Sequence, residues 1–120
     1  MVGRFPLYTD ADVYGPLVQA LIARGWDVVR AVTSRPEGED DLVHFKLAAE
    51  QDRVLVAHDQ HQHQFALEWI EAGKPFRGFL TWKQKHHERM SVGEFFEAFE
   101  ALAAEDDPFA YKIRYITPKR

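Results

Sequence analysis

Residues 53–59 read Arg-Val-Leu-Val-Ala-His-Asp, a compact apolar run that ends in two polar residues. A short run of this kind, rich in β-branched side chains, predicts a buried strand. Helical patterns are expected on either side of it, over residues 39–52 and 62–72, and Gly73 and Pro75 end the second of them. The stretch therefore predicts a strand between two helices, which is the building unit of a parallel sheet.

The same alternation continues outward in both directions. Further strands are expected at residues 5–9, 26–32, 79–82 and 111–116. One more helix opens at Pro16 and stops at Gly25, and another begins after Ser91, with Glu94 placed for a capping box. Strands that alternate with helices predict one three-layer α/β/α domain over residues 1–120, with a mainly parallel sheet of about five strands.

Composition removes several classes of function. The chain has 120 residues, a formal net charge of −4 and no cysteine, so disulfides, cysteine zinc sites and thiol catalysis are excluded. No apolar stretch approaches the roughly 18 residues of a membrane helix, so no membrane partner is expected and the cytoplasm is the expected compartment. Because the net charge is negative, nucleic-acid binding would need a local site.

Four acids are expected at one edge of the sheet. Asp10 and Asp12 follow the first strand, Asp59 follows the third, and Asp41 opens the second helix. Ligands of parallel sheets lie outside the carboxyl ends of the strands, and clustered carboxylates need a hard cation such as Mg²⁺ or Mn²⁺. This pattern predicts metal-assisted cleavage of phosphodiesters by activated water. The competing interpretation is that each acid only caps a helix or forms a turn.

Histidines near the third strand allow a second kind of site. His58, His61 and His63 surround Asp59 and could hold a transition metal such as Mn²⁺, Zn²⁺ or Ni²⁺ with that acid. On a regular helix, however, His63 points away from His61. The alternative is a solvated, weakly structured loop end.

A local group of cations follows the fourth strand in what we expect to be an exposed loop. It consists of Lys83, Lys85, His86, His87 and Arg89. Either it is a mobile polar loop or it forms a rim that contacts RNA phosphates, with Lys83, Lys85 and His86 binding the substrate. The neighbouring Trp82 could stack on a base, but a tryptophan at a strand end is expected in the core.

The last helix carries an apolar stripe formed by Phe95, Phe96, Phe99 and Leu102. We expect this face to pack on the sheet, as in most amphipathic helices. The alternative is an interface with a second copy of the chain or with an antitoxin protein.

Several segments resemble one known family. Residues 7–13, Leu-Tyr-Thr-Asp-Ala-Asp-Val, and residues 24–29, Arg-Gly-Trp-Asp-Val-Val, resemble the opening of PIN-like domains related to toxin ribonucleases. Residues 41–48 and 53–59 are similar to the acidic helix start and third-strand motif of that family. The resemblance implies a small endoribonuclease that depends on Mg²⁺ or Mn²⁺, acts on RNA and is often paired with an antitoxin.

Carried over by position, the resemblance implies that Asp10, Asp41 and Asp59 are catalytic metal ligands, and that Asp12 or His61 completes the site. The chain departs from the family pattern because Ala11 replaces a glutamate, Asp12 an asparagine and His61 a fourth acid. These departures favour a second hypothesis, a catalytically inactive PIN-like module that binds protein or RNA. A third hypothesis is a phosphate-accepting receiver-like domain, for which Thr81 is available but no lysine is clearly placed.

Overall fold

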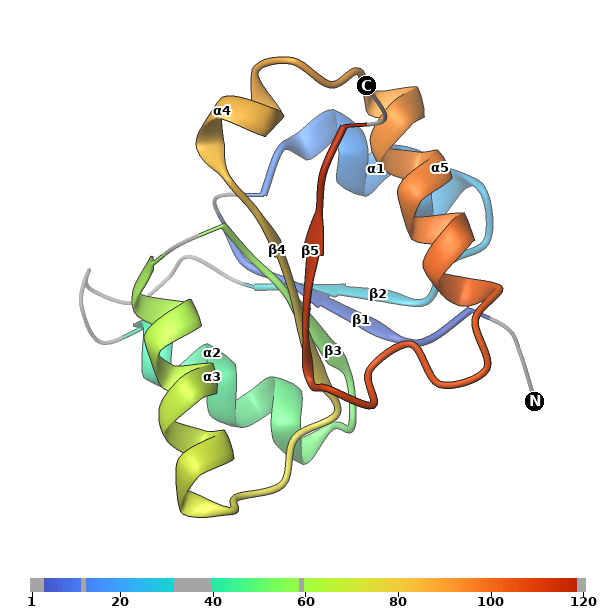
Figure 1. Ribbon diagram of the computed structural model, residues 1–120. Helices are drawn as coiled ribbons and strands as arrows, with labels where there is room; N and C mark the ends of the chain where they lie inside the picture. Colours follow the sequence, from blue (N-terminus) through green and yellow to red (C-terminus); the bar gives the residue numbers. More distant parts are fainter. Residues whose placement is uncertain (1–3, 12, 32–39, 59, 119–120) are drawn as a thin grey trace.

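The computed structural model describes residues 4–11, 13–31, 40–58 and 60–118, with the backbone alone for residues 40 and 41. Within these residues five strands form one sheet in the order β2-β1-β3-β4-β5, and all neighbouring strands are parallel (Figure 1). The elements are β1 (Leu7–Thr9), α1 (Gly15–Ala23), β2 (Val28–Arg30), α2 (Asp40–Glu50), β3 (Val54–Val56), α3 (Gln60–Ala72), β4 (Gly78–Trp82), α4 (Gln84–His87), α5 (Val92–Ala103) and β5 (Ile113–Ile116). The predicted fold class, a three-layer α/β/α architecture, is confirmed.

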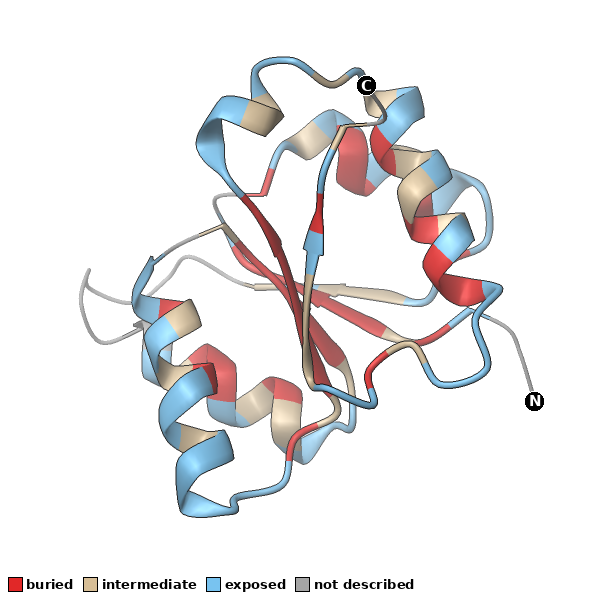
Figure 2. Cartoon of the chain, in the orientation of Figure 1, coloured by how far each residue is buried: buried red, intermediate tan, exposed pale blue. Residues whose placement is uncertain are grey.

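Alternation along the strands creates two separate cores. Leu7 and Val54 point toward α1 and α5, whereas Tyr8 and Leu55 point toward α2 and α3. Side chains of successive strand residues face opposite sides of a sheet, so each central strand is covered on both faces. Figure 2 shows the result as a sheet whose middle strands are buried along their whole length.

The connections between strands differ in their direction across the sheet and in the face on which their helices lie. The chain crosses from β1 to β2 through α1, then travels in the opposite direction across the sheet through α2 and α3 on the other face. The connection from β4 to β5 continues in that second direction, yet α5 packs beside α1. This last crossover therefore has the opposite hand to the first three, although one hand dominates in most parallel sheets.

The predicted helix boundaries are confirmed where a local signal sets them. Pro16 lies in the first turn of α1, and Gly25 beyond its end has a φ of 94°. Gly73 after α3 has a φ of 70°, a conformation that costs glycine little. Ser91 caps α5, with its hydroxyl accepting from the Glu94 amide at 3.1 Å and the Glu94 carboxylate accepting from the Ser91 amide at 3.0 Å.

The chain from the end of β4 through α5 follows the expectations for Trp82 and for α5, but not for the loop between them. Trp82 is 3% exposed and belongs to the core, as expected, and the apolar stripe of α5 packs on the sheet. The expectation of an exposed loop at residues 83–89 was wrong in part, because Gln84–His87 form one helical turn. None of the helices in the described ranges is long and apolar enough to cross a bilayer.

Candidate functional site

The strand order places a natural binding position above β1 and β3. Connections leave β1 and its neighbour β3 in opposite directions across the sheet, and ligands of such sheets bind outside the carboxyl ends at that switch point. Asp10 follows β1 at this position, and its amide donates to the Val56 carbonyl at 2.9 Å. Its side chain accepts from the Ala11 amide at 2.9 Å, and the residue is only 8% exposed. A largely buried carboxylate thus stands where a ligand is expected.

A buried polar pair lies beneath Asp10. The Tyr8 hydroxyl is 2.6 Å from Nδ1 of His44, and the two residues are 3% and 5% exposed. Burial raises the pKa of the Tyr8 hydroxyl, and the negative charge of Asp10 raises it further. Tyr8 therefore keeps its proton at neutral pH.

The backbone of the second predicted acid reaches the same edge. Asp41 lies in the first turn of α2, one turn before His44, which contacts Tyr8. α2 runs antiparallel to the strands, and His44 lies level with Tyr8. Asp41 is about one turn, or about 5.4 Å, nearer the start of α2, which puts its backbone level with the carboxyl ends of the strands. The Asp41 side chain, Asp12 and Asp59 lie outside the described residues, so their predicted role as ligands stays a prediction.

The three histidines predicted near β3 do not form one group. His61 is exposed on α3, whereas the His58 ring stacks on Trp82 at 5.6 Å between centroids and 27° between planes. His58 also stacks on His87, at 5.7 Å and 15°. His63 turns to Tyr115 instead. In the described part of the chain, no three histidine, aspartate or glutamate side chains are placed to hold a metal ion.

A pocket of about 430 Å³ opens at this edge, on the β4 and β5 side of His58. Tyr115 and His63 form one wall, and their hydroxyl oxygen and Nε2 are 2.5 Å apart. Thr81, which is 6% exposed, belongs to the lining. The complete lining among described residues is His58, Gln60, His63, Thr81, Trp82, Lys83, Gln84 and Tyr115.

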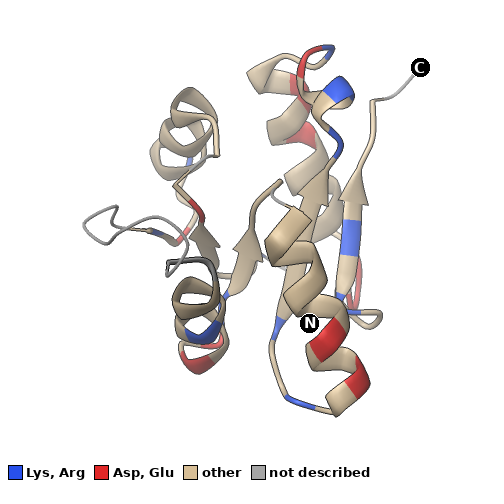
Figure 3. Cartoon of the chain, turned by 90° about the vertical axis from the view of Figure 1, so that its left-hand side faces the viewer, with Lys and Arg blue, Asp and Glu red and all other residues tan. Residues whose placement is uncertain are grey.

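The predicted cationic rim lies beside this pocket. Lys83 directly precedes α4, and both Lys83 and Lys85 are exposed. Figure 3 marks the positions of the lysines and arginines along the chain in blue. His86 is half-buried, and its Nδ1 has no hydrogen-bond partner among the described residues. The structure thus brings the three predicted substrate-binding residues to the same edge of the sheet as Asp10.

Buried polar atoms at this edge lack partners. Both amide atoms of Gln62, which is fully buried in the first turns of α3, make no hydrogen bond with any described residue. The buried Thr9 hydroxyl at the end of β1 likewise makes no hydrogen bond with any described residue. Native proteins satisfy most buried polar groups, so such atoms point to water or a ligand.

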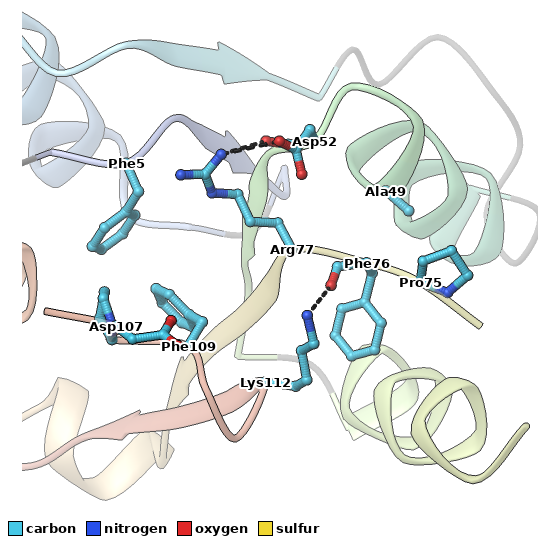
Figure 4. Close-up of a pocket in the computed structure, with 10 residues that line it drawn as sticks. Phe5, Ala49, Asp52, Pro75, Phe76, Arg77, Asp107, Phe109 and Lys112 are labelled. Carbon is cyan, nitrogen blue, oxygen red and sulfur yellow. Dashed lines mark hydrogen bonds and ion pairs between the residues drawn. The ribbon is translucent and has the colours of Figure 1, made fainter. Parts of the chain in front are cut away.

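A larger hollow at the opposite edge is a weaker candidate. It measures about 510 Å³ and is lined by Phe76, Arg77 and Lys112 among others (Figure 4). Its cations are already satisfied, because Arg77 pairs with Asp52 at 3.1 Å and Lys112 donates to the Phe76 carbonyl at 2.8 Å. The amino ends of the strands meet here, whereas ligands of parallel sheets bind at the carboxyl ends. We therefore interpret the residues of this hollow as structural.

The receiver-like hypothesis gains little from the described residues. The strand order 2-1-3-4-5 is the one that such doubly wound domains share, and Thr81 lies in β4. However, Lys112 lies before β5, at the amino end of the strands, and β5 itself contains no lysine. The cation that this chemistry needs at the carboxyl end of the last strand is not found in the described part of the chain.

Comparison with protein-family models, with curated proteins and with solved structures finds no match for this chain. The site must therefore be interpreted from its own residues. Sequence reasoning had not singled out Tyr8, His44, Gln62 or Tyr115. The sequence did hold a signal for Tyr8 and His44, because both carry polar atoms at positions that the apolar patterns assign to the core.

Proposed function

We propose that this protein is an endoribonuclease that depends on a divalent cation, Mg²⁺ or Mn²⁺. The observation that carries the proposal is Asp10, a carboxylate that is only 8% exposed at the switch point of a parallel sheet. Ligands of open parallel sheets bind outside the carboxyl ends of the strands, and a carboxylate there supplies the oxygen donors that a hard cation prefers. The cationic rim beside the same edge supports a phosphate-bearing substrate.

The residues at this edge fit a hard cation. Asp10 supplies oxygen donors, and the unpartnered Thr9 and Gln62 side chains leave polar atoms for bound water. Asp41 and Asp59 would complete the ligand set, with Asp12 or His61 beside them, as the resemblance to PIN-like domains implies. When bound, the cation supplies an activated water and neutralises charge at the phosphorus.

The chain's own residues would support this chemistry by orientation and charge. The buried Tyr8–His44 pair ties β1 to α2 close to Asp10. Because burial, together with the neighbouring Asp10 carboxylate, raises the pKa of Tyr8, the phenol stays neutral and does not add a second negative charge to the site. Lys83, Lys85 and His86 would hold phosphates of the RNA strand. An antitoxin partner stays a prediction from the resemblance.

One observation favours a second candidate, a catalytically inactive module that binds RNA or protein. His58, beside the expected metal position, stacks between Trp82 and His87. Together with Ala11 and His61 at motif positions, a packed histidine in this place suits a surface that binds without cleaving.

Thermal melting with metal ions separates these candidates. Binding to the folded state alone stabilises it by about 1.4 kcal/mol at ten times Kd, which raises the Tm of a small domain by several degrees. We expect Mn²⁺ or Mg²⁺ at millimolar concentration to raise the Tm of the wild type and of the control Asp106→Asn. Asp10→Asn and Asp59→Asn should abolish the shift, and cleavage of a labelled single-stranded RNA should require the same ions.

A wild-type protein that neither shifts with the ions nor cleaves RNA in their presence would overturn the nuclease. The inactive binding module would then be the better description.

A further inference from the structure

Two hollows meet at Tyr115. The pocket of about 430 Å³ beside His63 lies next to a second one of about 420 Å³, lined by Lys83, His86, Tyr115, Ile116 and Thr117. Tyr115 and Lys83 belong to both linings. The two hollows therefore share one aromatic residue and one cation.

The Tyr115 side chain is exposed but held. It is 54% exposed on β5, the strand at the edge of the sheet. Its hydroxyl is 2.5 Å from Nε2 of His63, and the two ring centroids are 5.7 Å apart. A ring oriented in this way in the free protein loses little entropy when a flat ligand packs against it. An ordered aromatic face open to solvent is a typical platform for an unstacked base.

The surroundings of the ring suit a nucleotide. Lys83 is exposed at the mouth of both hollows, and Lys85 lies two residues further along the same segment. The chain as a whole carries a net charge of −4, so this cationic segment is a local exception. Gln60 and Gln84 place amide groups in the lining, and amides can donate to and accept from base edges.

We propose that the hollows on either side of Tyr115 bind an unpaired nucleotide of single-stranded RNA, with its base against the Tyr115 ring and its phosphate at Lys83. This inference rests on the proposed function, because it adds a substrate subsite to the same edge of the sheet. β4, which leads to Lys83, lies two strand spacings (about 10 Å) from β1, and β5, which carries Tyr115, lies three (about 14 Å), so the subsite would hold a nucleotide one or two positions from the phosphate at Asp10. A duplex would not fit, because its bases are stacked and paired.

The test measures binding without cleavage. Fluorescence anisotropy of a labelled twelve-nucleotide single-stranded RNA is recorded in EDTA, where a metal-dependent nuclease is silent. Tyr115→Leu should weaken binding roughly 5- to 100-fold, the usual effect of removing a stacking partner. Tyr115→Phe keeps the ring but loses the hydroxyl contact with His63, so its affinity should lie between those of the wild type and Tyr115→Leu.

Matched variants make the result specific. Tyr111→Leu removes a tyrosine that is 87% exposed before β5 and should leave binding unchanged. Lys83→Gln should weaken binding and reduce the salt dependence by about one phosphate contact. Circular dichroism of each variant checks that β5 is still folded.

Each outcome distinguishes this subsite from the proposed activity. Loss of binding in Tyr115→Leu, without any cleavage by the wild type in Mn²⁺, would support the subsite and overturn the nuclease. Metal-dependent cleavage with undiminished binding by Tyr115→Leu would overturn the subsite alone. Equal affinity for single-stranded and duplex RNA, or no RNA binding by the wild type, would also overturn it.

Discussion

Tyr8 couples the buried interior of the sheet to the acid at its edge. Its ring fills the core under α2, while its hydroxyl is satisfied by His44 at 2.6 Å. A buried phenol without such a partner would lose roughly 1–3 kcal/mol of stability. Because the pKa of Tyr8 is raised in the fold, the stabilisation is complete below pH 10 and is lost as the pH rises beyond that ordinary value.

This coupling predicts a change in tyrosine titration. In Asp10→Asn the electrostatic part of the shift disappears, so the pKa of Tyr8 should fall toward 10.0 while burial still holds it higher. Ultraviolet absorbance of the phenolate during a pH titration measures this directly. Asp106→Asn, which changes an exposed acid after α5, should titrate like the wild type. Identical curves for all three proteins would mean that Asp10 does not act on Tyr8.

The elements differ in how far local sequence accounts for them. α5 has a capping box at Ser91 and a buried face of Phe95, Phe99 and Leu102, so its pattern predicts both its start and its orientation. α4 was missed because a single turn of four polar residues has no apolar periodicity to reveal it. Its last residue, His87, stacks on His58 and contacts Tyr14 and Phe95, and these ring contacts hold α4 at the end of β4.

The capping box makes a prediction about α5. Ser91→Ala removes the hydroxyl that accepts from the Glu94 amide and should lower the free energy of unfolding by about 1 kcal/mol. Urea denaturation provides the measurement. Gln19→Ala on the exposed face of α1 is the control and should stay within about 0.5 kcal/mol of the wild type. An unchanged midpoint for Ser91→Ala would show that water replaces the cap without cost.

At the scale of the whole molecule, the two edges of the sheet have different roles. Ion pairs collect where strands begin: Arg53 with Asp27 at 2.9 Å and Arg77 with Asp52 at 3.1 Å. Where strands end, the structure gathers a buried carboxylate, stacked histidines and exposed lysines. The first edge is held by ion pairs, and the second carries groups that suit a ligand.

The return from α5 to β5 depends on pH. Arg114 holds Glu105 through two hydrogen bonds of 2.7 and 3.1 Å, and this bonding lowers the pKa of Glu105 below its ordinary 4.5. A depressed folded-state pKa means that the stabilisation is present above pH 4.5 and is lost as the pH falls through the lower value. The effect is small because both side chains are partly exposed.

We therefore expect Glu105→Gln, which imitates the protonated acid, to be less stable than the wild type at pH 7. The difference in free energy of unfolding should shrink as the pH falls below 4.5, as followed by denaturant titrations at several pH values. Glu97→Gln on the exposed side of α5 is the control. A difference that stays constant with pH would assign the effect to packing instead of charge.

The candidate site could be predicted only in part. Asp10, Lys83, Lys85 and His86 were expected at one edge, and the described backbone places them there. The stacking of His58 could not be foreseen, because its partners Trp82 and His87 are more than twenty residues away in the chain. The contact of Tyr115 with His63 could not be predicted, because the alternation of a strand shows which side chains are exposed but not which distant residues they contact.

Local sequence patterns account for the order of the elements, for the parallel α/β class and for each described strand and helix except α4, because apolar periodicity, caps and glycine stops act over a few residues. The place of β1 between β2 and β3, and of α5 beside α1 on one face, depends on packing in three dimensions. Strand order depends on pairing between segments that are distant in the chain, and several orders bury the same apolar stripes. That order is what brings Asp10 to a switch point, and Tyr115 into the wall of a pocket.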